Sequence, residues 1–314
     1  MNKNPLVSIV VITYNSAKYV LETLESCKNQ TYRHIELIIT DDASTDHTVE
    51  ICEEWLEKNK DRFTGTKIVE ADKNSGISPN LNRGVYAAEG KWIKTVAGDD
   101  VLLSNCVSDY IDFAHEIGAP AELLASNTIN FITDKHGNKI ETYNYPKDVI
   151  LNRSLTHQDQ YELTLRAVSV SVISIFFLRE RFLEIGGCDE RYPMYEDKPL
   201  LFKFFKNGTK YYYLNKFTLK RRIHNESITG GELIVSSWKL NSFYPVHFDY
   251  VYNDLMLIEK MAFKYEYYVN CMVFRLKFKK SNVFQRIASK LLQLPAIAIN
   301  SLAEKNIINK YSSK

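Results

Sequence analysis

Two adjacent carboxylates stand directly after a short apolar run, where they could hold a metal ion. Asp99 and Asp100 follow residues 92–96, a run typical of a buried strand. Hard carboxylate oxygens suit Mg²⁺ or Mn²⁺, and a cation held by one or two carboxylates usually takes its other ligands from nucleotide phosphates and water. The pair could also bind the hydroxyls of a ribose. The competing interpretation is a solvated acidic turn that caps the next helix.

Polar residues also end two other predicted strands. The β-branched run at residues 7–13 leads into Tyr14 and Asn15, and the run at residues 35–40 leads into Asp42. In doubly wound sheets, ligands bind beyond the carboxyl ends of the parallel strands. The three polar strand ends are therefore expected to converge on one crevice.

The segments around these strand ends alternate between strand and helix patterns, which predicts βαβ units around a mainly parallel sheet. Ser16 is expected to cap one helix, and Pro79 to be the first residue of another. From about residue 121 the pattern changes. It predicts a hairpin at 134–138, a strand at 168–178, a helix at 179–185 stopped by Gly186 and Gly187, a helix ending at 207, two short strands within 210–222, and helices beyond about 232.

The composition is that of a folded α/β protein. The chain has 314 residues, enough for one large domain with a smaller appendage, and a formal net charge of +2, which does not favour nucleic acid. Its five cysteines lie far apart, which fits neither a disulfide framework nor a zinc cluster and favours a reducing cytoplasm. No segment has the roughly 18 to 20 apolar residues of a spanning helix, so any membrane contact is expected to be peripheral.

Five segments in one order resemble glycosyltransferase family two, and they cover about two thirds of the chain. The resemblance implies an inverting enzyme with the GT-A fold, a nucleotide-sugar-binding α/β architecture with a mainly parallel central sheet flanked by helices. It places the catalytic domain at 1–230, with a nucleotide-binding half at about 1–120 and an acceptor-binding half at about 121–230, and a helical C-terminal extension at 231–314. The segments are VSIVVITYN from Val7, DDASTDHT from Asp41, NSGISPNLNRG from Asn74, GKWIKTVAGDD from Gly90 and GGCDERYPMYEDKPLLFKF from Gly186.

The resemblance also implies which residues bind the nucleotide. Tyr14 would stack on uracil and Asp42 would accept its N–H, which favours a UDP-sugar as donor. Strand-end and turn residues equally often hold backbone groups, and a helix arginine is often simply solvated, so each further position has a structural alternative. The further nucleotide-binding candidates are Thr13, Asn15, Asn74, Arg83 and Asp99.

In the same resemblance, Asp100 is the main ligand of a Mn²⁺ or Mg²⁺ ion that bridges to the diphosphate. Many relatives carry another aspartate two positions before this pair, where this chain has Ala97, so diphosphate oxygens are expected to supply more of the ligands. Arg222 and His224 match an Arg-x-His segment that reaches the diphosphate, and His224 is also a candidate metal ligand. Their positive charge would offset the charge on departing UDP.

Glu196 and Asp197 match the family's second acidic pair, at the start of a predicted helix on the acceptor side. Inversion requires one carboxylate to take the proton of the acceptor hydroxyl as that oxygen attacks the anomeric carbon. Asp197 is the predicted catalytic base, and Glu196 is predicted to bind the acceptor. The alternative for both is a charge that stabilises the helix N-terminus.

The C-terminal extension interleaves basic and apolar residues from 272 to 292, a pattern that fits either an anionic membrane surface or a helix packed on the catalytic domain. In the first case, the expected acceptor is a lipid-linked sugar or glycan of bacterial surface-polysaccharide assembly, such as O-antigen or capsule, on the inner face of the cytoplasmic membrane. Two rival functions remain. A non-catalytic nucleotide- or glycan-binding module would have no chemical need for Asp99, Asp100, Asp197 and His224 together. A sugar nucleotidyltransferase would need a glycine-rich, basic loop where Tyr14-Asn15-Ser16 stands.

Overall fold

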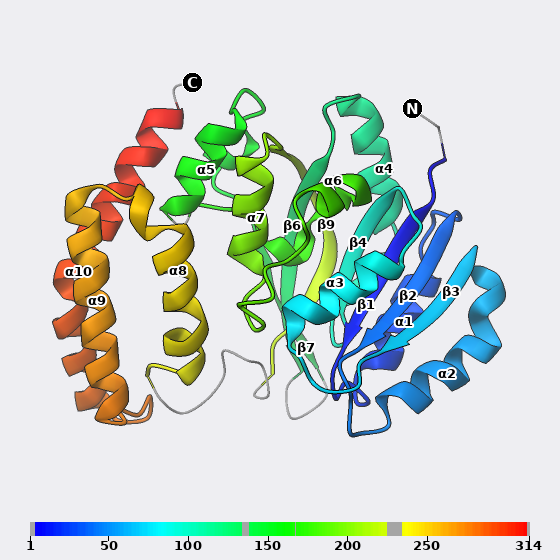
Figure 1. The fold of residues 1–314 in the computed structure, drawn as a ribbon, viewed down its shortest axis with the longest axis horizontal. Helices are drawn as coiled ribbons and strands as arrows, with labels where there is room; N and C mark the ends of the chain where they lie inside the picture. Colours follow the sequence, from blue (N-terminus) through cyan, green and yellow to red (C-terminus); the bar gives the residue numbers. More distant parts are fainter. Residues whose placement is uncertain (1–3, 134–137, 167, 225–233, 313–314) are drawn as a thin grey trace. The chain divides into compact units, whose positions relative to one another are not determined.

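The computed structural model describes residues 4–133, 138–166, 168–224 and 234–312 (Figure 1). The chain forms two compact units. The first comprises Met1–Arg153 and Val170–Ile223, and the second comprises Ser154–Ser169 and His224–Lys314.

A mixed sheet organises the first unit. Its strands follow the order β3-β2-β1-β4-β8-β6-β9-β5, and β7 lies beside β6. β1 pairs in parallel with both β2 and β4, and β2 pairs in parallel with β3, so the carboxyl ends of these four strands meet at one edge, as the sequence predicted. The strands are β1 Val7–Thr13, β2 Ile35–Asp41, β3 Gly65–Glu70, β4 Trp92–Ala97, β5 Val101–Leu102, β6 Leu123–Thr133, β7 Lys139–Asn144, β8 Phe176–Leu178 and β9 Tyr211–Arg222.

Helices cover both faces of this sheet. In Figure 1, α3, α6 and α7 lie in front of the sheet and α1, α2 and α4 lie behind it. The two layers explain why nearly every residue of β1 and β2 is buried, since helices cover both faces of these strands. The helices are α1 Val20–Lys28, α2 Thr48–Asn59, α3 Ile77–Ala87, α4 Cys106–Ile117, α6 Arg179–Glu184 and α7 Asp197–Lys206, with short turns η1 Lys60–Arg62, η2 Asp148–Leu151 and η3 Val172–Ser174.

Aromatic side chains fill the core on each side of the sheet. Behind it, the ring of Phe176 stacks between Trp92 and Tyr110, with ring centroids 4.9 Å apart in both pairs. In front of it, Phe177 stacks on Phe182 of α6 and contacts Phe204 of α7. Because adjacent residues of a strand point to opposite faces, the short strand β8 anchors both layers.

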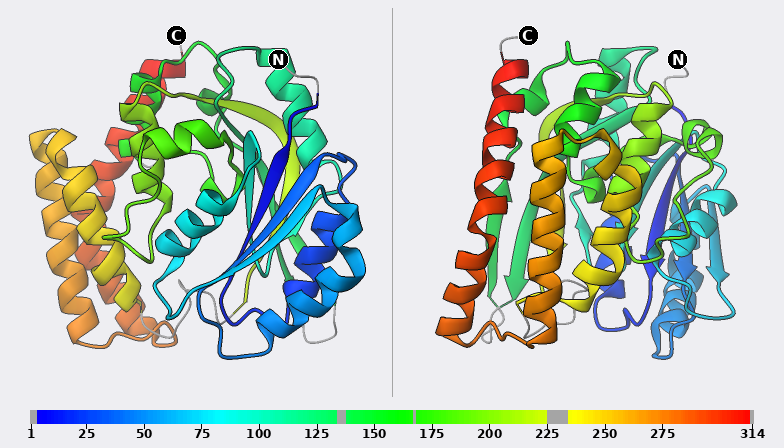
Figure 2. Two further views of the ribbon diagram at one scale, coloured as in Figure 1. Left: turned by 45° about the vertical axis from the view of Figure 1, so that its right-hand side comes forward. Right: turned by 60° about the vertical axis from the view of Figure 1, so that its left-hand side comes forward.

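The second unit is helical, and Figure 2 shows α8, α9 and α10 from two further sides. α9 packs against α10, while Lys310 of α10 forms an ion pair with Glu162 of α5 (2.8 Å) and Arg166 forms one with Glu259 of α9 (2.8 Å). Within the described residues, no helix combines the length and apolarity needed to cross a bilayer. The elements are α5 His157–Leu165, η4 Lys239–Phe243, α8 Tyr244–Tyr250, η5 Tyr252–Asp254, α9 Leu257–Arg275 and α10 Val283–Ser312.

Two predicted helix starts in the first half of the chain are wrong by a few residues. The Ser16 hydroxyl donates to the Tyr14 carbonyl instead of capping a helix, and the Ser16 carbonyl closes a turn by accepting the N–H groups of Tyr19 and Val20. α1 therefore begins at Val20. Pro79 is the third residue of α3, where its missing N–H still costs no intrahelical hydrogen bond.

The predicted strand at 168–178 is also wrong, because only Phe176–Leu178 is a strand and Val172–Ser174 forms a tight turn before it. The cause is Lys94, which is completely buried in β4 and donates through Nζ to the Ile173 carbonyl at 2.8 Å. A buried ammonium must find acceptors, and the bent backbone supplies them.

The segment 210–222 is one strand instead of two short ones. Its pairing with β6 shifts register on either side of Asn127, which explains why the sequence pattern looked interrupted. β6 and β7 pair antiparallel, with Thr133 opposite Lys139, while the predicted turn residues 134–137 lie outside the described residues. The helices predicted at 179–185 and up to 207 are confirmed as α6 and α7, and Gly186 and Gly187 have the left-handed φ of a helix stop.

The close packing of α3 on the sheet predicts that a larger residue at Gly84 destabilises the protein. A Cβ atom at Gly84 would lie 2.5 Å from Val10 and 2.8 Å from Thr40, so Gly84→Ala forces the helix away from β1 and β2. We expect the free energy of unfolding in urea to fall by about 1–3 kcal/mol. The control is Gly65→Ala, whose Cβ has Glu36 as its nearest neighbour at 3.9 Å; an equal loss in both variants would contradict the close packing of α3.

Candidate active site

The turn after β1 holds two predicted nucleotide-binding residues in place and exposes a third. The Thr13 hydroxyl donates to Asp41 (2.7 Å). Asn15 has a left-handed backbone with φ of 48°, and its side-chain oxygen accepts the Thr45 N–H at 2.8 Å. Tyr14 between them is 47% exposed, so its ring is available to stack on a planar ligand.

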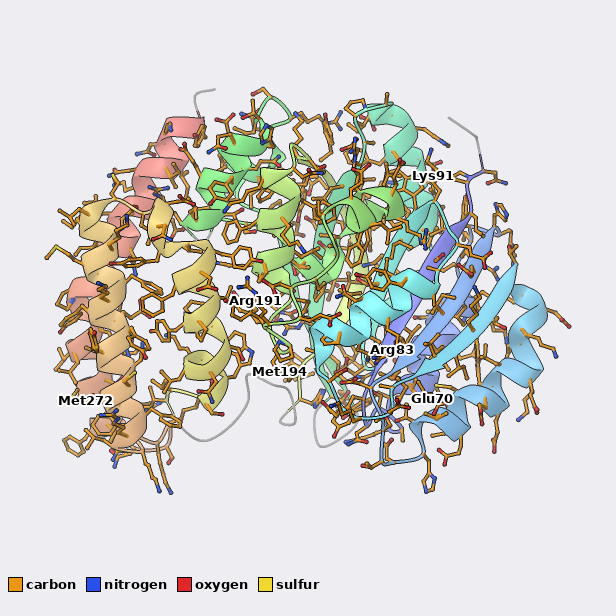
Figure 3. All side chains as sticks on the ribbon, viewed as in Figure 1. Glu70, Arg83, Lys91, Arg191, Met194 and Met272 are labelled. Atoms are coloured by element: carbon orange, nitrogen blue, oxygen red, sulfur yellow. The ribbon has the colours of Figure 1, made fainter. Side chains whose placement is uncertain are left out.

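Asp42 is buried at the end of β2 and binds the loop that precedes α3. One carboxylate oxygen accepts the N–H groups of Ser75 (3.0 Å) and Gly76 (2.7 Å), and the other accepts the Ser75 hydroxyl (2.7 Å). Arg83, labelled in Figure 3, donates to the same second oxygen at 3.1 Å, while Asn74 lies exposed beside the loop. Four donors match the number of hydrogen bonds that a carboxylate ordinarily accepts, so a nucleobase N–H that reaches Asp42 must exchange with one of them.

Asp99 and Asp100 form the turn between β4 and β5, and Asp100 is almost fully buried. One oxygen of Asp100 accepts the backbone N–H of Arg222 at 2.9 Å. Burial, followed by the negative charge of Asp99, raises the pKa of Asp100 from 3.8 to about 7. A cation at this turn would offset the cost of burying the Asp100 charge and its repulsion by Asp99. The two carboxylates therefore fit a metal ion.

The side chain of Arg222 braces the same turn. Its Nε donates to the Asp99 carbonyl (2.9 Å) and its Nη2 forms an ion pair with Glu22 (2.5 Å). The guanidinium lies 4.5 Å from the ring centroids of both Tyr19 and Phe131. These contacts bury Arg222 and tie β9 to the metal-binding candidates.

Glu196 and Asp197 stand side by side at the start of α7. Both side chains keep some solvent access, but protein atoms surround them densely. This burial raises the pKa of both groups, and the nearby charge of Asp197 raises the pKa of Glu196 further. The neighbouring Glu196 side chain instead lowers the pKa of Asp197, which favours ionisation of Asp197 before Glu196.

Arg221 is a site residue that the sequence analysis missed. It is exposed, and its positive charge lowers the pKa of Asp100 and of Asp197, which places it near both acidic pairs. The Arg221-Arg222 doublet was the available signal. The motif match selected its second member, but neighbouring strand residues point to opposite faces, and the structure buries that one.

The remaining predicted metal ligand is His224, which belongs to the second unit. Among the side chains that the structure describes, no three or more His, Cys, Asp or Glu residues gather closely enough to form a metal cage. A site at Asp99 and Asp100 would therefore take most of its ligands from substrate oxygens and water.

Curated relatives of this chain are bacterial glycosyltransferases. It is 30% identical over 126 residues to glycosyltransferase GlyG of Streptococcus pneumoniae, covering 40% of each chain, so it spans less than half the length of that relative. It is 25% identical over 231 residues to the putative teichuronic acid biosynthesis glycosyltransferase TuaG of Bacillus subtilis, covering 74% of this chain and 84% of TuaG.

Solved structures confirm the predicted fold. The structure of S. aureus TarS 1-349 in complex with UDP-GlcNAc matches with a TM-score of 0.61 at 18% identity, covering 98% of this chain and 92% of that one. The fold is the predicted GT-A architecture, a central sheet flanked by helices with a C-terminal helical region. The model of the family described as "Glycosyl transferase family 2" matches residues 8–179, more than half of the sequence, and the chain belongs to that family.

Proposed function

We propose that this chain is an inverting glycosyltransferase that moves a sugar from a UDP-sugar to an acceptor hydroxyl. The observation that carries the proposal is the pairing of two unlike acidic sites near one exposed arginine. Asp99 and Asp100 suit a cation and a diphosphate, while Glu196 and Asp197 are adjacent carboxyl groups whose pKa values are raised by burial. Arg221 acts electrostatically on both pairs, as a group between leaving diphosphate and attacking hydroxyl should.

In this mechanism, Asp197 takes the proton of the acceptor hydroxyl while the hydroxyl oxygen attacks the anomeric carbon from the face opposite the diphosphate. Glu196 contacts the acceptor and, as the neighbour of Asp197, partly offsets the rise in the pKa of that base. The bond to the diphosphate breaks as the glycosidic bond forms. Holding both substrates in line supplies much of the rate.

The donor site lies at the ends of β1 and β2. Tyr14 stacks on uracil and Asp42 accepts its N–H, in exchange for one of the donors on the α3 loop. Thr13 and Asn15 shape the turn beneath the base, Asn74 and Arg83 border it, and Asp99 binds ribose. UDP is favoured over other nucleotides because Tyr14 and Asp42 stand where the resemblance places uracil contacts.

A divalent cation, Mn²⁺ or Mg²⁺, would be held by Asp100 with help from Asp99, and when bound it would stabilise the negative charge of the diphosphate. Arg222 keeps the Asp99-Asp100 turn in place through its bond to the Asp99 carbonyl. Arg221 and Arg222 together add positive charge on the diphosphate side.

The raised pKa of Asp100 predicts a pH dependence of metal binding. The folded-state pKa of about 7 lies above the ordinary value of 3.8, so the folded protein binds a proton that a cation must displace. Between pH 5 and 7, we expect Mn²⁺-dependent UDP affinity to rise by about tenfold per pH unit, and to level off above 7. Calorimetric titration at each pH measures this; a flat profile would show that Asp100 is not the ligand.

The acceptor we propose is a glycan or a lipid-linked sugar of bacterial surface-polysaccharide assembly, such as O-antigen or capsule. The name of the relative TuaG supports this class, since it refers to the biosynthesis of teichuronic acid. The alternative is a non-catalytic nucleotide- or glycan-binding module. The presence of a carboxyl pair with raised pKa at Glu196 and Asp197 favours the enzyme, because binding alone needs no base.

We further propose that the second unit lies on the inner face of the cytoplasmic membrane. Apolar side chains on α9 and α10 stay exposed at intervals of three to five residues, and Phe284 is 86% exposed. Six cations and no acid occupy residues 275–290, so the end of the helix pair complements anionic lipid rather than a second copy of itself. The exposed apolar residues are Leu257, Met261, Tyr265, Tyr268, Met272 (labelled in Figure 3) and Leu276 of α9 and its end, and Phe284, Ile287, Leu291 and Leu294 of α10.

Flotation with vesicles containing anionic lipid tests this surface. We expect the triple variant K277S/K279S/K280S to bind about a hundredfold more weakly than the parent protein, since each basic residue near the bilayer contributes about 1 kcal/mol. The control K58S/K60S/K73S removes the same charge from exposed positions of the first unit. Equal flotation of both variants would refute a lipid contact at this end of α9 and α10.

The donor assignment is tested by calorimetric titration of the intact protein with UDP, in the presence and absence of Mn²⁺. We expect metal-dependent binding of UDP, and weaker binding of GDP. Turnover is then measured as UDP release from a panel of UDP-sugars. Absence of UDP binding under both conditions would refute the uracil contacts and favour another nucleotide.

A further inference from the structure

The segment that leads to the predicted base has little regular structure of its own. Residues 187–196 connect α6 to α7 through successive turns, closed by the N–H groups of Tyr192 and Tyr195. Both of these tyrosine side chains are buried, whereas Arg191 and Met194, labelled in Figure 3, are exposed. The position of Asp197 therefore depends on what holds this segment from outside.

One face of α3 holds it at two points. Asn82 makes a paired contact with the backbone of Cys188: its side-chain oxygen accepts the N–H at 2.7 Å, and its side-chain nitrogen donates to the carbonyl at 3.1 Å. Four residues earlier on the same helix face, Ser78 donates its backbone N–H to the Pro193 carbonyl (3.0 Å) and its hydroxyl to the Tyr192 carbonyl (2.8 Å). Both side chains are almost completely buried.

The contact is too close for larger residues. A Cβ atom at Gly187 would lie 2.5 Å from the Asn82 oxygen, and a Cβ atom at Gly76 would lie 2.6 Å from Pro193. Both glycines also have left-handed φ angles, 62° and 96°. The backbone of the segment thus lies directly against α3 at both ends of the contact.

The other face of α3 is bound to the donor side of the sheet. The Asn80 side chain donates to the Thr13 carbonyl (3.1 Å) and accepts from the Thr40 hydroxyl (2.6 Å). At the start of the helix, Gly76 donates its N–H to Asp42 (2.7 Å). One helix of three turns therefore joins the ends of β1 and β2 to the segment that carries the base.

From these contacts we propose that Ser78 and Asn82 are positioning residues, which set the place of Glu196 and Asp197 relative to the donor turn at Asp42. The inference rests on the proposed function for its catalytic consequence, but the mechanical connection stands on the contacts alone. A displacement of about 1 Å at a reacting group costs about a hundredfold in rate. Loss of the α3 contacts should thus slow the reaction without weakening UDP binding.

The test compares Asn82→Ala and Ser78→Ala with Tyr86→Phe, which removes a hydroxyl from the same face of α3 and leaves the bonds of Ser78 and Asn82 in place. Hydrogen exchange of residues 187–196 reports the segment, calorimetry reports UDP affinity, and UDP release from the best-hydrolysed UDP-sugar reports the rate and its pH profile. For Asn82→Ala and Ser78→Ala we expect at least tenfold faster exchange, UDP affinity within twofold, at least tenfold slower release and a displaced acid limb of the pH profile. Tyr86→Phe should match the parent protein in all four.

Unchanged exchange of residues 187–196 in folded Asn82→Ala and Ser78→Ala would overturn the proposal. So would a parallel loss of UDP affinity, release rate and melting temperature, because that pattern indicates general destabilisation. If one variant does not fold, the other decides the question. A parent protein that binds no UDP would refute the proposed function, while the exchange comparison would still decide whether α3 holds the segment.

Discussion

Replacing Asp197 with asparagine is expected to abolish sugar transfer while UDP binding stays within about twofold of the parent value. Asparagine keeps the shape of the side chain but cannot take the acceptor proton, and loss of a general base costs about 100- to 10,000-fold in rate. The donor contacts at the ends of β1 and β2 do not involve this residue. The measurement pairs UDP calorimetry with UDP release from a UDP-sugar.

The matched control is Asp109→Asn on α4, which removes a carboxylate whose partner is the exposed Lys216. A variant with Asp197→Asn that retained most of the parent rate would refute the base assignment. The pH profile gives a second check. Because burial raises the pKa of Asp197 above 3.8, activity should increase with pH through this raised pKa as the base becomes ionised, so the acid limb should lie above the range of an ordinary carboxyl group.

Replacing Asp100 with alanine is expected to remove the metal-dependent part of UDP affinity, a loss of at least about tenfold. Binding of UDP without metal should persist, because Tyr14 and Asp42 remain. The folded protein itself should lose little stability at neutral pH. Burial raises the pKa of Asp100 to about 7, so its ionised carboxylate is itself unfavourable in the folded state. Titration of UDP with and without Mn²⁺ measures the difference.

Asp100→Asn separates charge from structure in this experiment. Its side-chain oxygen can still accept the Arg222 N–H, as the Asp100 oxygen does at 2.9 Å. We expect this variant to lose the Mn²⁺ effect as fully as Asp100→Ala does. Retention of the full Mn²⁺ effect in both variants would place the cation elsewhere and leave Asp100 as a structural residue of the turn.

The local pattern of the sequence was sufficient to predict the donor half of the fold. The β-branched run at 7–13 and the apolar run at 35–40 specify strands buried on both faces, and β1 and β2 are such strands. Successive side chains of a strand point to opposite faces, and both faces are buried here. A shift of one residue would change which side chains meet each layer, so the register of pairing is restricted. Asp42 and Asp99 follow the strands directly, so their place at one sheet edge was predictable from chain order.

Only the tertiary structure decided which of two neighbouring arginines is buried and which is exposed. Arg221 and Arg222 are equivalent in the sequence, but Glu22, Tyr19 and Phe131 come together from distant segments to bury Arg222 and leave Arg221 exposed. The same holds for the turn at 172–174, which depends on buried Lys94 of another strand.

The grouping of residues 154–169 with the C-terminal helices has a similar origin. It depends on long-range ion pairs, Glu162 with Lys310 and Arg166 with Glu259. Likewise, the contact of Asn82 with Cys188 joins residues 106 positions apart. Sequence periodicity reports the environment of a residue along its own element, whereas these partners become neighbours only when the elements pack. The sequence by itself therefore determined the parallel strands of the donor half, the acidic turns and the family, and the packing of the elements decided how the site residues are held.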